Sequence, residues 1–250
     1  MTLNGKTILI TGASRGIGAA AAIACREAGA RVIAHASRPS DAAAKTAQAL
    51  GQAGGDFLFE DLSGPHAGFR LVEAALARAD RLDCVVNNAG TYTAAPLTGD
   101  LAEWDAGWAT AHAVNVRGPA DICRACIAHF RERGVGGIIV NVASRAGHRG
   151  DGVENASYAA SKGAVLAMTK TWARGLAAEN ILLYAIAPGW VETRMAPQDI
   201  AARAEAVKDI PLGRVAQPEE IASLIAYLTS GACPSATGAT FDVNGASYVR

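Results

Sequence analysis

Short runs of apolar residues alternate along the chain with longer alanine-rich segments, in which apolar positions recur at helical spacing. Nearly continuous apolar runs such as 138–142 are typical of strands buried on both faces, as in a parallel sheet. This pattern predicts strands at 7–10, 31–36, 56–59, 84–87, 137–142, 181–187 and 240–243. It predicts helices near 16–28, 40–50, 65–79, 101–133, 156–179 and 218–229.

Strands that alternate with helices predict right-handed βαβ units, and therefore an α/β fold with a doubly wound parallel sheet of about seven strands and helices on both faces. No internal repeat, linker or shift of composition divides residues 1–250, so we expect a single domain. The segment at about 190–211 is irregular and follows the sixth strand. Ligands of open α/β sheets bind outside the carboxyl ends of the strands, so this segment is predicted to be a substrate lid.

Composition excludes several classes of protein. Half of the 250 residues are hydrophobic, which is too many for a disordered chain. Lys and Arg number 23 and Asp and Glu 23, without a basic cluster, so we expect neither nucleic acid nor a membrane as a partner. An odd five cysteines and no signal-peptide pattern favour a reduced, cytoplasmic protein. No metal site is expected, because the histidines lack ligand spacing and Cys123 and Cys126 lie in a helical pattern.

Glycine is enriched, with 27 residues in 250, and its positions are informative. Three glycines fall between the first strand and the first helix, in the turn Gly12, Ala13, Ser14, Arg15, Gly16, Ile17, Gly18. Glycines let the backbone approach a pyrophosphate, and the helix N-terminus offers free N–H groups there. We interpret the turn as a dinucleotide-binding site; a tight turn without a ligand is the alternative.

The end of the second strand bears on which dinucleotide is bound. An acidic residue here would bind the ribose 2′-hydroxyl of NAD, but the chain has Ala36, followed by Ser37 and Arg38. The guanidinium of Arg38, together with that of Arg15, suits the 2′-phosphate of NADP. NADP is therefore predicted and NAD less expected, the alternative being that both arginines are solvated surface charges.

Tyr158 and Lys162 lie four residues apart in a helical pattern, which puts both side chains on one face. A tyrosine titrates near pH ~10, so a phenolate at neutral pH needs a cation beside it. Lys162 could supply that cation and also hydrogen-bond a cofactor ribose. Such a pair occurs by chance in many helices, so alone it indicates little.

Three polar positions elsewhere change this picture. Ser144 ends the fifth strand, where its hydroxyl could hold a substrate carbonyl. Asn115 falls inside a long helical pattern, either as a structural cap or kink or as a group that holds water in a proton relay. Asn88 to Gly90 follow the fourth strand, either packing near a cofactor or forming an ordinary turn.

In this order the motifs resemble the classical short-chain dehydrogenase/reductase family over essentially the whole chain. They are Thr11-Gly12-x-x-x-Gly16-x-Gly18, Asp61-Leu62, Asn87-Asn88-Ala89-Gly90, Asn115, Ser144, Tyr158-x-x-x-Lys162 and Pro188-Gly189 with Thr193. The resemblance implies a Rossmann-type sheet, a nicotinamide cofactor and a catalytic tetrad of Asn115, Ser144, Tyr158 and Lys162. It also implies a homo-oligomer, a tetramer joined through the helices at 101–133 and 156–179.

The same resemblance implies which residues bind the cofactor. Asp61 and Leu62 would lie at the adenine, residues 88–90 on the adenosine side, and Pro188, Gly189, Val191 and Thr193 at the nicotinamide carboxamide. The ending Thr237 to Gly245 is similar to that of the 3-oxoacyl-carrier-protein reductases. Glu179, however, stands near where those enzymes have a docking arginine, which makes a carrier-bound substrate less expected.

We therefore expect an NADP(H)-preferring oxidoreductase that transfers a hydride between nicotinamide and a carbonyl or secondary alcohol, with Tyr158 as general acid and base. An NAD-dependent sugar or secondary-alcohol dehydrogenase, or a non-catalytic dinucleotide sensor, are the alternatives. Arg145, His148 and Arg149 follow Ser144 in the next loop. They are expected to be solvated, with contact to an anionic substrate as the other interpretation.

Overall fold

The computed structural model describes residues 2–51, 57–196 and 199–250. Its centre is one parallel sheet of seven strands in the order β3-β2-β1-β4-β5-β6-β7, which confirms the predicted doubly wound arrangement. The strands are β1 (Thr7–Ile10), β2 (Arg31–Ala36), β3 (Phe57–Phe59), β4 (Cys84–Asn87), β5 (Gly137–Val142), β6 (Ile181–Pro188) and β7 (Thr240–Val243). Asp56, predicted to begin the third strand, lies outside the described residues.

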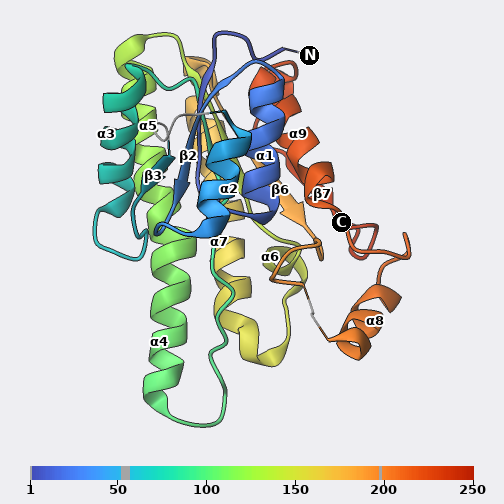
Figure 1. Ribbon diagram of the computed structural model, residues 1–250. Helices are drawn as coiled ribbons and strands as arrows, with labels where there is room; N and C mark the ends of the chain where they lie inside the picture. The colour runs from blue at the N-terminus through green and yellow to red at the C-terminus, as the bar shows by residue number, and fades with distance from the viewer. Residues whose placement is uncertain (1, 52–56, 197–198) are drawn as a thin grey trace.

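Side chains that alternate along each strand fill two separate cores. Ile8 and Ile10 of β1 pack against α1 (Gly16–Glu27) and α9 (Pro218–Ser230), whereas Leu9 between them faces α3 (Ala67–Ala79) and α5 (Gly118–Arg133). Figure 1 shows α1 and α9 on one side of the sheet and α3 and α5 on the other. Burial on both faces explains why the strands are almost entirely apolar.

The remaining helices extend the fold beyond the sheet. They are α2 (Asp41–Ala49), α4 (Leu101–His112), α6 (Ala146–Arg149), α7 (Ala156–Leu176) and α8 (Ile200–Lys208), with short 3₁₀ turns at Val153–Asn155, Ala177–Glu179 and Pro234–Ala236. The segment at about 190–211 was predicted to be irregular, which is wrong for residues 200–208, because they form α8. Asp199 caps that helix by accepting a hydrogen bond from the Ala202 N–H, at 2.9 Å. Residues 197–198 of the predicted lid lie outside the described residues.

The long helix predicted at 101–133 is also interrupted. A π-helical turn, Ala113–Arg117, separates α4 from α5. Pro119, in the first turn of α5, has no N–H to donate, and its ring would clash with the Asn115 carbonyl of a continuous α-helix. The wider turn relieves this clash, and such turns are frequent at functional sites.

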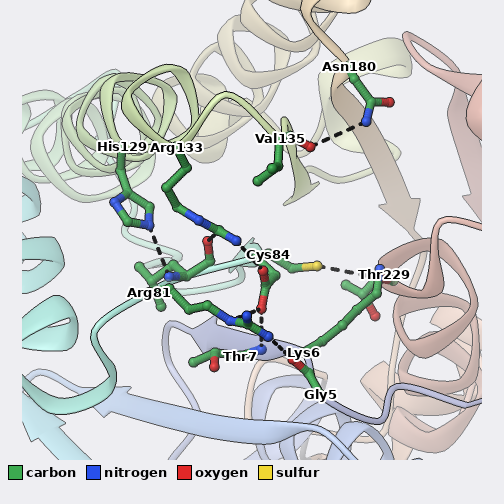
Figure 2. A network of polar contacts seen from close by, with 12 residues as sticks. Gly5, Lys6, Thr7, Arg81, Cys84, His129, Arg133, Val135, Asn180 and Thr229 are labelled. Atoms are coloured by element: carbon green, nitrogen blue, oxygen red, sulfur yellow. Dashed lines mark hydrogen bonds and ion pairs between the residues drawn. The ribbon is translucent and has the colours of Figure 1, made fainter.

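The amino edge of the sheet is closed by a network of polar contacts (Figure 2). Asp83 accepts hydrogen bonds from the Thr7 N–H at 2.8 Å and from Arg133 at 3.0 Å. Lys6 donates to the carbonyls of Thr229 and Ser230 at the end of α9, at 2.9 and 3.1 Å. These charged groups satisfy one another and the backbone, and so tie the strands and α9 together.

Candidate active site

A cavity of 960 Å³ opens at the carboxyl edge of the sheet, where the strand ends meet. Its volume is typical of small-molecule and cofactor sites. Of the residues predicted to bind cofactor or substrate, those on its wall are Gly12, Ser14, Arg15, Gly16, Ile17, Ser37, Asp61, Leu62, Asn88, Ala89, Gly90, Ser144, Tyr158, Lys162, Pro188, Gly189, Val191 and Thr193. Gly18, Arg38 and Asn115 do not line it.

The glycine turn after β1 has the geometry of a cradle for a ligand. Gly12 and Gly16 have φ angles of +67° and +55°, which only glycine adopts without strain. A Cβ atom on Gly18 would lie 2.3 Å from the Gly12 carbonyl oxygen, so Gly18 acts by close packing behind the turn. The turn leads into the N-terminus of α1, whose free N–H groups suit a phosphate.

The end of β4 holds this turn in place. The Asn88 side-chain amide donates to the carbonyl oxygens of Thr11 at 2.9 Å and Gly12 at 3.2 Å. In return, the Thr11 hydroxyl accepts the backbone N–H groups of Asn88 and Ala89, both at 3.0 Å. Asn88 and Ala89 thus fix the glycine turn at the wall of the cavity.

His35 also supports the turn, a role that no motif in the sequence indicated. Its side chain is buried in β2, and Nδ1 accepts the Gly12 N–H at 3.4 Å while Nε2 contacts the Glu60 carbonyl at 2.8 Å. Acceptance at Nδ1 requires the proton to be on Nε2. Burial lowers the pKa of His35, which keeps the ring neutral in this arrangement.

Two further exposed arginines lie within electrostatic reach of the exposed Arg15. Burial and the charges of Arg194 and Arg38 lower the pKa of Arg15. Arg15 and Arg194 line the cavity. The sequence had suggested Arg15 and Arg38 but not Arg194, which lies far along the chain, after β6.

Asp61 also lies on the cavity wall, and its carboxylate already accepts hydrogen bonds. Oδ1 accepts the Ser63 N–H at 2.9 Å and the Ser63 hydroxyl at 2.8 Å. These hydrogen bonds lower the pKa of Asp61, so it is a carboxylate at neutral pH.

Tyr158 reaches the cavity from the first turns of α7. Burial raises its pKa, and a hydrogen bond with the Ser144 hydroxyl opposes that rise. The Ser144 oxygen is itself fixed, because it accepts the Ala146 N–H at 3.1 Å. The phenol is therefore protonated at neutral pH and lies beside a second hydroxyl, as a proton donor to a carbonyl oxygen would require.

Lys162 lies one turn further along α7, with its Nζ 5.8 Å from the centre of the Tyr158 ring. It is almost fully buried and donates to the Val142 carbonyl at 2.9 Å. Burial lowers the pKa of Lys162 to about 8. Lys162 is not among the groups that shift the pKa of Tyr158, so the expectation that its charge lowers this pKa stays a prediction.

Asn115 lies in the π-helical turn, outside the cavity wall, and contacts residues near the site through hydrogen bonds. Its side chain accepts the Thr91 N–H at 2.8 Å and donates to the Thr91 carbonyl and the Ser161 hydroxyl, both at 3.0 Å. It thereby joins the chain after β4 to α7, next to Lys162.

The loop after Ser144 departs from expectation. Arg145 was expected to be solvated, but it is only 8% exposed and lines the cavity. Its backbone N–H donates to the Pro188 carbonyl at 2.9 Å, which draws the residue under the end of β6. Arg149 is exposed as predicted, and it also lines the cavity.

Two aromatic residues complete the wall. The Tyr92 ring packs edge-on against Tyr158, with 4.7 Å between ring centres, and Trp190 lies 6.5 Å beyond Tyr92. Burial and the carboxylate of Asp151, which the Tyr92 hydroxyl hydrogen-bonds, raise the pKa of Tyr92 to about 12. Tyr92 lies in the loop at 91–99, which the sequence indicated as one that shapes the pocket, although no motif singled out Tyr92 itself.

Two kinds of feature are absent from residues 2–51, 57–196 and 199–250. This part of the chain has no group of three or more His, Cys, Asp or Glu residues placed to hold a metal ion. None of the helices described is long and apolar enough to span a bilayer.

Comparison with known proteins agrees with this geometry. A family model described as enoyl-(acyl carrier protein) reductase matches residues 12–246. The 3-oxoacyl-[acyl-carrier-protein] reductase FabG of Thermotoga maritima is 36% identical over 249 residues, covering 98% of both chains. The 3beta-hydroxysteroid dehydrogenase 1 of Eggerthella lenta is 35% identical over 255 residues, 97% of this chain and 94% of that one.

A solved structure matches closely as well. It is a 3-oxoacyl (acyl-carrier-protein) reductase from Agrobacterium tumefaciens with NADP bound, with a TM-score of 0.87 and 33% identity over 98% of this chain and 95% of that one. The family resemblance in the motifs is thus confirmed over the whole chain. The chain belongs to the short-chain dehydrogenase/reductase family of NAD(P)-dependent oxidoreductases.

Proposed function

We propose that this protein is an NADPH-preferring carbonyl reductase that also works in reverse on secondary alcohols. The observation that carries the proposal is the protonated phenol of Tyr158 on the cavity wall, hydrogen-bonded to Ser144 and one helical turn from Lys162. These groups can hold a carbonyl oxygen and give it a proton. A dinucleotide sensor would need none of them.

Each residue has a distinct task in this reaction. A nicotinamide cofactor, when bound in this cavity, would supply the hydride for the carbonyl carbon. Tyr158 donates the proton to the carbonyl oxygen, which Ser144 holds and polarises by a hydrogen bond. Lys162, charged below about pH 8, stabilises the phenolate that the transfer leaves behind. Asn115 positions α7 through Ser161. Orientation within the cleft contributes much of the remaining acceleration.

Arg15 and Arg38 support the preference for NADPH. Neither forms an ion pair with another described residue, and the charges of Arg194 and Arg38 both act on Arg15. A 2′-phosphate would relieve this repulsion and accept charge-assisted hydrogen bonds. Ala36 leaves no carboxylate at the end of β2 to repel it. The NADP bound to the similar Agrobacterium reductase agrees with this assignment.

The test is a screen of purified enzyme against ketones, acyl thioesters and sugars, with NADPH and NADH followed by their absorbance. Oxidation of NADPH with at least one carbonyl, at a kcat/KM above that with NADH, is expected. Equal or better use of NADH would favour the NAD-dependent dehydrogenase. Tight NADPH binding without turnover on any carbonyl would favour the sensor.

We further propose that the enzyme works in the cytoplasm as a homotetramer, joined through α4, α5 and α7. Trp108 and Leu101 of α4 have exposed apolar side chains, 36% and 77% accessible, which suit a contact between copies. Light scattering is expected to give the mass of four chains, and the mass of one chain would contradict this assembly.

A further inference from the structure

We propose that the substrate carries a carboxylate that binds Arg145, so that the enzyme acts on oxo acids and the matching hydroxy acids. This inference rests on the proposed reductase function and adds the substrate class. Only the carbonyl reacts, and the carboxylate serves as a binding group.

The first observation is a cation that the described protein leaves unpaired. Arg145 is 8% exposed, and its Nη1 atom is buried without a hydrogen-bond partner. Within residues 2–51, 57–196 and 199–250, no carboxylate lies within ion-pair distance of its guanidinium. A buried donor without a partner is costly, and a buried charge more so, and most such groups in folded proteins are paired. A ligand anion would supply the missing partner.

The second observation is where this cation lies. Arg145 directly follows Ser144, and both line the cavity. The Arg145 guanidinium carbon is 6.0 Å from the centre of the Trp190 ring, which also lines the cavity. An aromatic wall therefore leads from Tyr158 through Tyr92 and Trp190 to Arg145. A carbon skeleton can lie along this wall with its carbonyl at Tyr158 and its carboxylate at Arg145.

The surrounding charges favour an anion. Arg149, on the same wall, adds a second positive charge, whereas Asp151 and Asp209 act on Arg145 with the opposite sign. Neither carboxylate is in contact with Arg145, and that of Asp151 accepts the Tyr92 hydroxyl. A bidentate carboxylate matches the planar fork of an arginine, while a substrate ammonium would face two guanidinium groups.

The experiment compares acids with their esters at saturating NADPH. The probes are 4-oxopentanoate, 5-oxohexanoate and the methyl ester of each, since the ester keeps the carbonyl and the chain but removes the charge. For at least one chain length, kcat/KM of the acid is expected to exceed that of the ester by tenfold or more. A wild-type enzyme that reduces every ester as well as its acid would overturn the inference while leaving the reductase function intact.

Variants then assign the preference to Arg145. Arg145→Met keeps the apolar stem against Trp190 and removes the charge; it is expected to lower kcat/KM of the acid about 10- to 100-fold, chiefly through KM, and to abolish the preference over the ester. Arg145→Lys should retain part of the preference for the acid over the ester, and it is the variant to measure if Arg145→Met does not fold. Arg174→Met, on the exposed face of α7 outside the cavity, should keep the full preference for the acid over the ester. An acid-to-ester ratio that stays at the wild-type value in the folded Arg145 variants would overturn the assignment.

Discussion

Charged side chains lie at both edges of the sheet, but at one edge they are paired within the protein and at the other they are not. At the amino edge, Asp83 is shared by Thr7 and Arg133, and Lys6 caps α9 (Figure 2). At the carboxyl edge, Arg145 forms no ion pair with a carboxylate of the described chain, and Lys162 is buried with one carbonyl as its acceptor. Charges paired within the protein hold strands together, whereas charges left unpaired at a cavity are available to a ligand. The following predictions test this distinction, from the largest effect to the smallest.

Tyr158→Phe is expected to have the largest effect. Losing the hydroxyl removes the proton donor, so kcat should fall about 10³-fold, within the range usual for general acid catalysis. The phenyl ring still packs against Tyr92, so the cavity should keep its shape. Stopped-flow or steady-state assays measure kcat, and the quenching of protein fluorescence by NADPH measures binding. A variant with near-wild-type kcat would rule out Tyr158 as the acid.

Replacing Arg15 and Arg38 together by Ala should change the cofactor preference. Loss of the charge-assisted hydrogen bonds to a 2′-phosphate is expected to lower kcat/KM for NADPH about 10- to 100-fold and to leave that for NADH nearly unchanged. Steady-state rates with the two cofactors give the ratio, with Arg174→Ala as the matched exposed control. A parallel fall for both cofactors would mean that these arginines act on the fold and not on the phosphate.

The pH profile should reveal the buried Lys162. Its pKa is lowered to about 8, so the ammonium group is present below that pH and lost above it. The kcat/KM for NADPH, which reports groups of the free enzyme, should be level up to about pH 8 and then fall, approaching tenfold per pH unit. Tyr158 remains protonated in this range because its pKa is raised. A profile that stays level well above pH 8 would show that the charge of Lys162 is not needed.

The sequence predicted the fold from local patterns, and it predicted much of the cavity wall partly from such patterns and partly from the family resemblance, which alone pointed to residues 61–62 and 188–193. Apolar strands, glycine spacing and strand ends each carry a signal within a few residues of the chain. The burial of Arg145 was missed because it depends on the Pro188 carbonyl, which β6 brings up from more than forty residues away. The helix at 101–133 was predicted as continuous, although a kink at Asn115 was one of two interpretations, and Pro119 four residues later contained the signal for the break between α4 and α5.

The raised pKa of Tyr158 illustrates a further limit. The spacing of Tyr158 and Lys162 correctly places both on the cavity wall. It does not reveal how deeply each side chain is buried, and burial moves the pKa of the phenol up and that of the ammonium down. The balance between burial and a neighbouring charge is set by packing from several elements, which no short motif contains.

The amino edge should respond to mutation in stability and not in catalysis. Asp83→Ala leaves the Thr7 N–H and the guanidinium of Arg133 without their shared carboxylate, so the free energy of unfolding should fall by about 2 kcal/mol. Urea titration at fixed protein concentration measures this change, since assembly would otherwise shift the midpoint. Glu73→Ala, at an exposed position of α3 outside the proposed contact between copies, is the matched control and should change stability by less than about 0.5 kcal/mol.

The decisive readout for the comparison is kcat/KM per folded Asp83→Ala enzyme, which should stay within about twofold of wild type. The network lies at the end of the strands away from the cavity, and Asp83 is not among the residues that line the cavity. The charged groups of this network bind backbone groups and one another, so removing one weakens the sheet without removing a group that a ligand uses. A large fall in kcat/KM with little change in stability would mean that a fully paired charge cluster can still serve the active site, and that pairing does not separate structural from functional charges in this fold.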